Sequence, residues 1–302
     1  MEAPFRRDRC ANRKVRLVEQ DLLLPEFLGP LVRNTIFAGH IHHSLQVEST
    51  NLLASRAAAA GRNSDKLSEG EVFLAEEQTA GRGRGNHSWY SERGAGIYCS
   101  VILRPQIKAP DVLWLSLIAA VASQDAVKEV TGGIADIRWP NDLLLNDKKF
   151  CGILTEVHTE SNHVHHAIIG IGMNVNHHQF PDELRGTATS LRLETGMEWS
   201  RLELTAALLK SLDREYRALL RAVHSPGPSS AHRYEPILRR VEARSSYAHG
   251  KHVHVDENGG YSGITDGLDP RGFLRVRTEH GLRMAISGSV RPLPRRPDAA
   301  GD

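Results

Sequence analysis

Apolar and polar positions along the chain alternate in patterns that predict short strands separated by loops. Residues 72–75 (V-F-L-A) form an apolar run, and residues 97–103 (I-Y-C-S-V-I-L) form an alternating one, so both are expected to be strands. Two further runs are joined by the turn residues Asn146-Asp147, which predicts a hairpin. The other expected strands are 41–48 and 168–176, and the hairpin strands are 143–145 and 148–156.

Apolar residues at helical spacing predict helices between these strands. Residues 111–130 carry Leu113, Leu117 and Val121 on one face, which is typical of an amphipathic helix. Residues 52–61 follow the polar triplet Ser49-Thr50-Asn51, whose side chains are preferred at helix N-caps. Further helical stretches are expected at 201–220 and 235–242, and a weak one at 22–34.

The pattern changes after the segment S-P-G-P-S-S at residues 225–230, which has the composition of a linker. From Tyr247 onward, five short strands separated by turns predict a small barrel. The expected organisation is an N-terminal polar and helical extension (1–38), a larger α+β domain (39–240), a small barrel (245–292) and a disordered tail (293–302).

Composition excludes several classes of protein. The 302 residues carry a net charge of +2, so no strongly basic nucleic-acid surface is expected, and the arginine-rich residues 6–16 are interpreted as a solvated tail. Cys10, Cys99 and Cys151 are widely spaced, which favours reduced thiols and a cytoplasmic location. No run reaches the roughly 18 apolar residues of a membrane span, and no secretory signal is recognised.

The stretch between the first two strands has the strongest chemical signal. Gly81, Gly83 and Gly85 alternate with Arg82 and Arg84. Glycines allow a backbone to approach a ligand closely, and guanidinium groups bind carboxylates and phosphates through paired donors. The sequence therefore predicts a loop that holds an anion.

Other polar positions have simpler interpretations when taken alone. Ser49, Thr50 and Asn51 read as a helix cap, Lys149 as a solvated strand residue and Asp142 as a turn residue. The histidines lack an ordered ligand spacing, so no metal site is expected; they stand at positions 158, 163, 165, 166, 177 and 178.

Two motifs change these interpretations. The run G-R-G-R-G-N-H-S-W-Y-S (81–91), followed by G-A-G-I-Y-C-S-V-I-L-R-P (94–105), resembles the signature of biotin–protein ligases. The segments R-W-P-N-D-L (138–143) and K-F-C-G-I-L-T-E (149–156) resemble the second signature of that family. One departure is His87, which stands where many bacterial members have a third arginine. The likeness covers residues 40 to 292 and ends in a stretch similar to the family's SH3-like domain.

The resemblance implies roles for residues that stand in the motifs. Ser49, Thr50 and Asn51 would bond the ureido head of biotin, and Lys149 would contact its carboxylate and the α-phosphate. Asp142 would orient or deprotonate the acceptor lysine, and Trp89 would pack on biotin or adenine, with core packing as the alternative. Because side chains alternate along a strand, only one of Lys148 and Lys149 is expected to face the site. The remaining implied ligand-binding residues are Gln78, Gly81, Arg82, Gly83, Arg84, Asn141, Gly152 and Asn174, and the implied catalytic set is Lys149, Arg82 and Asp142.

The resemblance also implies a fold and a reaction. The fold would be α+β, with a mixed central sheet flanked by helices, as in the class II synthetase-like ligases, plus an SH3-like barrel. ATP and biotin, with Mg²⁺, would give biotinyl-5′-adenylate, and biotin would pass to a lysine of a biotin carboxyl carrier protein. The loop would order over the intermediate. No nucleic-acid or membrane partner is implied, and a homodimer is left open.

Two alternatives remain open. A lipoate or octanoyl ligase would share the catalytic fold but use another acyl group. A non-catalytic biotin sensor would bind biotin without releasing pyrophosphate. A repressor role is disfavoured because residues 1–38 show no pair of helices with a tight turn.

Overall fold

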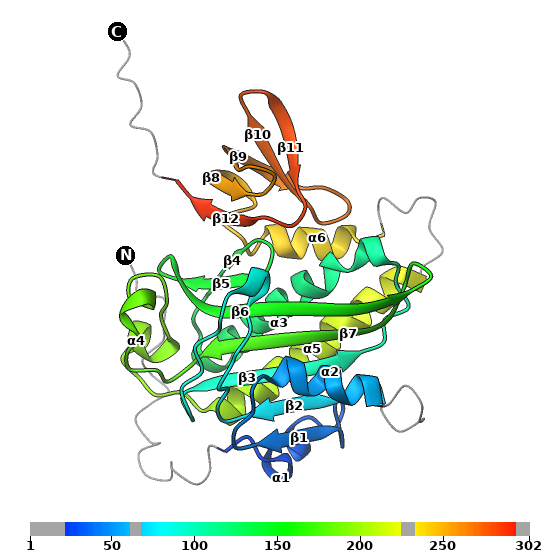
Figure 1. Cartoon of the computed structure of the whole chain (residues 1–302), viewed down its shortest axis with the longest axis vertical. Helices are drawn as coiled ribbons and strands as arrows, with labels where there is room; N and C mark the ends of the chain where they lie inside the picture. Colours follow the sequence, from blue (N-terminus) through cyan, green and yellow to red (C-terminus); the bar gives the residue numbers. More distant parts are fainter. Residues whose placement is uncertain (1–21, 61–67, 225–232, 294–302) are drawn as a thin grey trace.

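The computed structural model of the chain describes residues 22–60, 68–224 and 233–293. They form a larger body around a seven-stranded sheet and a smaller one around a five-stranded sheet (Figure 1). No helix in these three ranges is long and apolar enough to cross a membrane.

The seven-stranded sheet is mixed. Its order is β1-β2-β3-β7-β6-β5-β4, and only the β1–β2 pair is parallel. The long antiparallel pair β6 and β7 lies near its middle and carries the site described below. The strands are β1 (Ile41–Ser44), β2 (Val72–Ala75), β3 (Gly96–Leu103), β4 (Asp136–Arg138), β5 (Asp142–Leu145), β6 (Lys148–Glu160) and β7 (His163–Asn174).

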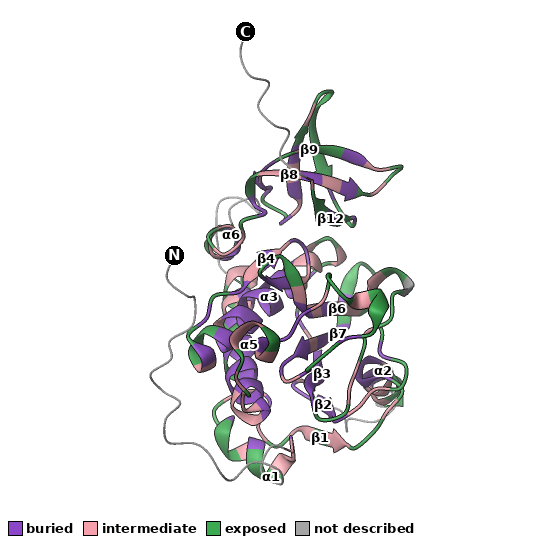
Figure 2. Cartoon of the chain, turned by 90° about the vertical axis from the view of Figure 1, so that its left-hand side faces the viewer, coloured by how far each residue is buried: buried purple, intermediate pink, exposed green. Residues whose placement is uncertain are grey.

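Helices cover the two faces of this sheet unequally. Helices α3 (Leu113–Thr131) and α5 (Arg201–His224) lie on one face, and the shorter α2 (Thr50–Ala60) lies on the other (Figure 2). The remaining elements of this body are short: α1 (Pro25–Leu28), η1 (Gly29–Leu31), η3 (Arg84–Asn86), η4 (Ala109–Asp111), η5 (Asp182–Leu184) and α4 (Leu191–Thr195).

The alternation of side chains along β7 explains this asymmetry. Ile169, Ile171 and Met173 join the main apolar core under α3 and α5. The intervening Gly170 and Gly172 point to the opposite face, because successive side chains in a strand alternate. Burial of a large apolar surface stabilises the first face, whereas the second carries only a small apolar cluster in which Phe73, Ile102 and Ile168 pack against α2.

The second body is a five-stranded antiparallel sheet, consistent with the SH3-like barrel expected from the sequence. Its order is β11-β10-β9-β8-β12, and α6 (Glu235–Glu242) lies between it and the larger body (Figure 1). Its strands are β8 (His249–Asp256), β9 (Tyr261–Leu268), β10 (Leu274–Thr278), β11 (Gly281–Ala285) and β12 (Ser289–Pro292).

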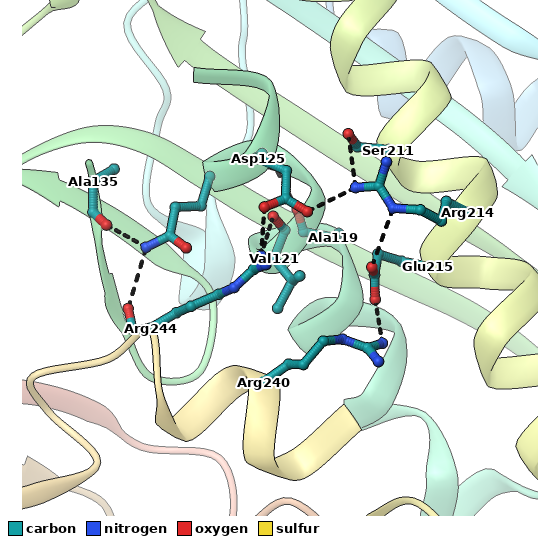
Figure 3. Close-up of polar contacts among 11 residues, drawn as sticks. Ala119, Val121, Asp125, Ala135, Ser211, Arg214, Glu215, Arg240 and Arg244 are labelled. Carbon is teal, nitrogen blue, oxygen red and sulfur yellow. Dashed lines mark hydrogen bonds and ion pairs between the residues drawn. The ribbon is translucent and has the colours of Figure 1, made fainter. Parts of the chain in front are cut away.

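Ion pairs fasten α6 to the helices of the larger body (Figure 3). Asp125 of α3 lies 2.6 Å from Arg244, the second residue after α6, and 2.7 Å from Arg214 of α5. Glu215 of α5 lies 2.6 Å from Arg240 of α6. A carboxylate on each of the two long helices therefore holds an arginine on or next to α6.

Most elements lie where the apolar pattern predicts them, with a few differences. The weak helix expected at 22–34 is only α1 and η1, because Pro30 has no N–H to continue it. The first strand ends at Ser44, four residues early, and Thr50 and Asn51 lie inside the first turn of α2. Strand β7 starts at His163, five residues early, because antiparallel pairing with β6 extends it through polar residues. The arginine-rich segment, Cys10, the linker 225–230 and the tail after Leu293 lie outside the described residues, and the domain boundaries stay a prediction.

Candidate active site

Three glycines on the face of the sheet that carries α2 form the floor of the candidate site. They are Gly152 on β6 and Gly170 and Gly172 on β7, and Gly152 and Gly172 are register partners. A Cβ at Gly172 would stand 2.5 Å from Cε2 of Trp89, and one at Gly152 would stand 2.8 Å from its Cζ3. The missing side chains are what allow a bulky group to lie on the strands.

A buried polar cluster forms one side of the site. Ser49, Thr50 and Asn51, at the start of α2, are almost completely buried. Ser100 of β3 donates to Asn51 Oδ1 at 2.6 Å and lies 2.8 Å from the Thr50 hydroxyl. Gln78 Oε1 accepts from the backbone N–H of Thr50 at 2.9 Å. Side chains used only for capping would point at free backbone N–H groups, whereas these bond one another over the sheet.

Glu156 of β6 connects this cluster with the glycine-rich loop. Its Oε2 accepts from Asn51 Nδ2 at 2.8 Å, and its Oε1 lies 3.1 Å from Arg82 Nη2. Glu156 is not among the site residues predicted from the sequence. Its place as the last residue of the run K-F-C-G-I-L-T-E was the available signal.

Lys149 lies at the opposite end of the floor. Its ammonium is 2.5 Å from Asp142 Oδ1, as an ion pair, and 5.5 Å from the centre of the Trp89 ring. Lys148 is exposed, so the two lysines face different environments, as the alternation of a strand requires. Arg138 Nη2 lies 2.6 Å from the other oxygen of Asp142.

This arrangement keeps Asp142 ionised. Burial alone would raise the pKa of the Asp142 carboxyl, but the charges and hydrogen bonds of Lys149 and Arg138 outweigh burial and lower the pKa. A carboxyl with a lowered pKa is a weak base at neutral pH and a good anionic partner for a cation.

The loop between β2 and β3 covers the floor. The backbone N–H of Trp89 donates to the carbonyl of Gly81 at 2.8 Å, and a Cβ at Gly81 would collide with the backbone carbonyl of Trp89. Gly83 N–H donates to the carbonyl of His87 at 2.6 Å, while the His87 side chain is exposed. Gln78 Nε2 donates to Ser91 Oγ at 2.9 Å. The loop is thus closed on itself by contacts between its two halves.

The two arginines of the loop have different neighbours. Arg82 pairs with Glu156, whereas Arg84 lines a cavity of about 390 Å³ together with Phe273 and Ile286, which flank strands β10 and β11 of the smaller body. Burial lowers the pKa of Arg84, and the charges of Asp142 and Glu257 oppose that effect. The two guanidinium groups therefore contact different parts of the site.

Asn141 and Asn174 lie at the ends of their strands. Asn141 Nδ2 donates to the carbonyl of Ile153 at 2.7 Å, which joins the start of β5 to β6, and Asn141 also lines the cavity near Arg84. Asn174 Nδ2 donates to the carbonyl of Thr189 at 3.0 Å. Asn174 Oδ1 and Trp89 Nε1 are buried without a hydrogen-bond partner among the described residues. Such groups are costly unless a ligand or water satisfies them.

The histidines form ring contacts. His158 and His166 stack with ring centres 5.4 Å apart, and His177 stacks on Phe180 at 5.2 Å. Among the residues described by the structure, no group of three or more histidines, cysteines or carboxylates is arranged to hold a metal ion.

These features together describe a site for a small molecule with a polar head, an apolar body and an anionic end. The buried amide and hydroxyl groups suit the head, the glycine floor and indole suit the body, and the ammonium suits the anion. Of the residues predicted from the sequence, Arg84 and Asn141 line the neighbouring cavity, and Arg84 is within electrostatic reach of Asp142.

The chain is similar in sequence to biotin ligases over most of its length. The model of the biotin/lipoate A/B protein ligase family matches residues 45–174. The bifunctional ligase/repressor BirA of Bacillus subtilis is 34% identical over 264 residues, which are 86% of this chain and 76% of that protein. The biotin–[acetyl-CoA-carboxylase] ligase of Paracoccus denitrificans is 32% identical over 255 residues, which are 81% of this chain and 97% of that protein.

Solved structures agree with the sequence comparisons. The biotin protein ligase from Aquifex aeolicus in complex with biotin and ATP has a TM-score of 0.69 and 26% sequence identity. The match covers 84% of this chain and 100% of the Aquifex chain. Both of the sheets described above therefore have counterparts in a solved protein.

Proposed function

The chain belongs to the biotin protein ligase family, and we propose that it is a single-function member, a ligase without a repressor role. Its activity is that of a biotin–protein ligase. The proposal is supported by the 32% identity to the Paracoccus biotin–[acetyl-CoA-carboxylase] ligase and by residues 1–38, whose sequence shows no pair of helices with a tight turn. The proposed protein partner is a biotin carboxyl carrier protein, and a homodimer and a cytoplasmic location stay predictions from the sequence.

The first step joins biotin to AMP. A carboxylate oxygen of biotin forms a bond to the α-phosphorus of ATP, the bond from that phosphorus to the bridging oxygen breaks, and pyrophosphate leaves. Lys149 supports this assignment, because its ammonium stands at one end of the glycine floor. A fixed positive charge there would stabilise the negative charge that builds up in the transition state.

The polar head of biotin would lie in the buried cluster at the start of α2. The ureido group has N–H donors and a carbonyl acceptor, and Asn51, Thr50 and Ser100 offer partners of both kinds. Binding would replace bonds that these side chains now make with each other. A site built this way discriminates strongly against analogues that lack the matching groups.

The second step transfers biotin to the carrier. The ε-amine of the carrier lysine attacks the carbonyl of the mixed anhydride, the carbonyl–phosphate bond breaks, and AMP leaves with the electron pair. The attacking nitrogen gives up a proton to solvent as the amide forms, and the ionised state of Asp142 favours a role in orienting the incoming amine through its N–H groups. Strong proton abstraction is less suited to a carboxylate whose pKa is lowered.

Mg²⁺ would accompany ATP. The described residues contain no group of three ligands arranged for a metal, and Mg²⁺ bound with nucleotides is held largely by phosphates, water and one or two carboxylates. The ion would supply neutralisation of phosphate charge.

Arg82, Arg84 and Trp89 are proposed to close over the intermediate with the loop between β2 and β3. Arg82 pairs with Glu156, a residue that also holds Asn51, so ligand binding at Asn51 and movement of Arg82 would be linked. Exclusion of water by such a loop would limit hydrolysis of the adenylate. Gln78, Gly81 and Gly83 belong to the same loop and are proposed to bind the ligand with it. Asn141, Gly152 and Asn174 are proposed to bind the ligand from the strands beneath the loop.

The observation that carries the proposed site is the position of Lys149 above Gly152 and beside Trp89. The test is ATP- and biotin-dependent mass gain on a biotin carrier domain, with a lipoyl domain as the control acceptor. Mass gain on the carrier domain alone is the expected result. Gain on the lipoyl domain alone would show that the acyl pocket is misassigned, and biotin binding without transfer would favour a sensor.

A further inference from the structure

A buried ion pair lies beneath the loop that covers the candidate site. Arg201 is the first residue of α5, and its Nη1 lies 2.7 Å from Glu76 Oε2. The two side chains are only 3% and 2% exposed. Neither residue belongs to the motifs or to the floor, so the proposed reaction does not use them directly.

The pair contacts both ends of the loop. Glu76 directly follows β2, where the loop begins, and Arg201 Nη1 also donates to the carbonyl of Gly96, where β3 begins. Gly94 N–H donates to the carbonyl of Glu76 at 3.0 Å. One guanidinium therefore joins the two ends of a segment that carries Gln78, Arg82 and Trp89.

Glu76 has further partners that fix its carboxylate. Its Oε1 accepts from the backbone N–H of Leu23 at 3.1 Å and lies 2.8 Å from His43 Nε2. Burial would raise the pKa of Glu76, but Arg201 and His43 outweigh burial and keep the pKa low. A fully desolvated pair with this many directed contacts allows little freedom in the position of either end.

Buried ion pairs are weak sources of net stability, because apolar residues of similar size often serve as well. Because this pair joins the two ends of the loop, fixing the position of those ends is a better explanation for it than a contribution to the free energy of folding. We propose that Arg201 and Glu76 are positioning residues, which hold the two ends of the loop together and thereby set how long the biotinyl-adenylate stays bound. This inference rests on the proposed assignment of that loop to the ligand.

The chain offers a matched pair that does not touch the loop. Glu215 is 5% exposed and lies 2.6 Å from Arg240, and this pair joins α5 to α6 (Figure 3). Arg240 itself is 35% exposed, so Arg240→Met removes the arginine partner of a buried carboxylate on α5 without opening a buried position. It therefore controls for the general loss of an ion pair on α5.

The experiment measures release of adenylate formed on the enzyme from biotin and ATP, without a carrier. Arg201→Met and Glu76→Gln are expected to speed release by up to about 100-fold, as misplacement of a binding element can do. Trypsin cleavage at Arg82 and Arg84 in the presence of adenylate should accelerate in the same variants. Arg201→Lys, which keeps the charge but not the fork of donors, should fall between them and wild type.

Several outcomes would overturn the inference. Release as slow as wild type in Arg201→Met, or equal acceleration in Arg240→Met, would reduce the pair to a structural role. If a single variant fails to fold, the double variant Glu76→Met/Arg201→Met removes both charges and keeps apolar contact, and unchanged release there would also reject the inference. Failure of the wild type to form adenylate would instead reject the proposed function.

Discussion

Trp89 lies flat against Gly172, so that a Cβ at position 172 would stand 2.5 Å from Cε2 of the indole. The same ring covers Gly152 and lies beside the Lys149 ammonium. The residue that closes the site is thus seated on backbone atoms, and a ligand that lies on the floor must share this space with the indole.

Gly172→Ala is expected to weaken biotin binding. The added methyl group would push Trp89 off the strand and narrow the site, and overpacking of this kind costs about 1–3 kcal/mol. Steady-state kinetics should show a rise in KM for biotin of about tenfold or more. Gly29→Ala is the control, since a Cβ there has no neighbour within 4 Å. Equal changes of the biotin KM in both variants would contradict the role of the contact between Trp89 and Gly172.

Lys149→Ala is expected to lower kcat for adenylation by about 100- to 1000-fold, the usual cost of losing one group that stabilises transition-state charge. Lys148→Ala should retain wild-type activity because Lys148 is exposed and lies outside the site. Pyrophosphate release in single-turnover reactions measures the step directly. Comparable losses in the two variants would mean that the assignment of Lys149 is wrong.

Ser100→Ala is expected to raise KM for biotin while leaving the loop intact. The substitution leaves Asn51 Oδ1 without its 2.6 Å donor, and an unsatisfied buried polar group costs about 1–3 kcal/mol. Ser123→Ala is the control, because Ser123 is equally buried but donates to the carbonyl of Ala119 in α3. A biotin KM that changes only in Ser123→Ala would refute the role of the cluster.

His177 is expected to make stability depend on pH. Burial lowers its pKa from 6.5 to about 4, so the folded chain binds this proton less readily than the unfolded chain. Stability should be fully present above about pH 6.5 and should fall as the pH drops toward 4, by up to about 3 kcal/mol. Urea unfolding at a series of pH values measures the slope.

The variant His177→Phe should flatten that slope, since the ring that stacks on Phe180 is kept without a titrating group. His178→Gln serves as the reference because His178 is exposed. An unchanged slope in His177→Phe would assign the pH dependence to other groups.

Individual helices and turns could be predicted from the sequence because neighbouring residues determine them. The spacing of Leu113, Leu117 and Val121 predicts α3, and Asn146-Asp147 predicts the turn between β5 and β6, where both residues have positive φ. The start of β7 was missed because His163, His165 and His166 carry no apolar signal. Their strand conformation comes from pairing with β6.

The candidate site was accessible only in part. The motifs identify Lys149 and Trp89, but nothing local connects Ser100 on β3 with Asn51 on α2, or Glu76 with Arg201 across 125 positions. These contacts depend on the sheet order and on how α2 and α5 pack on its two faces. Such long-range information is absent from the spacing of residues along the chain.

The glycine floor has a consequence for the entropy of binding. Gly152, Gly170 and Gly172 have no rotatable side chains, so a ligand that lands on them immobilises none. The strands beneath are held by hydrogen bonds on both sides of β6 and β7, and their conformational freedom is already lost when the chain folds. The cost of ordering this part of the site is therefore met during folding, before any ligand arrives.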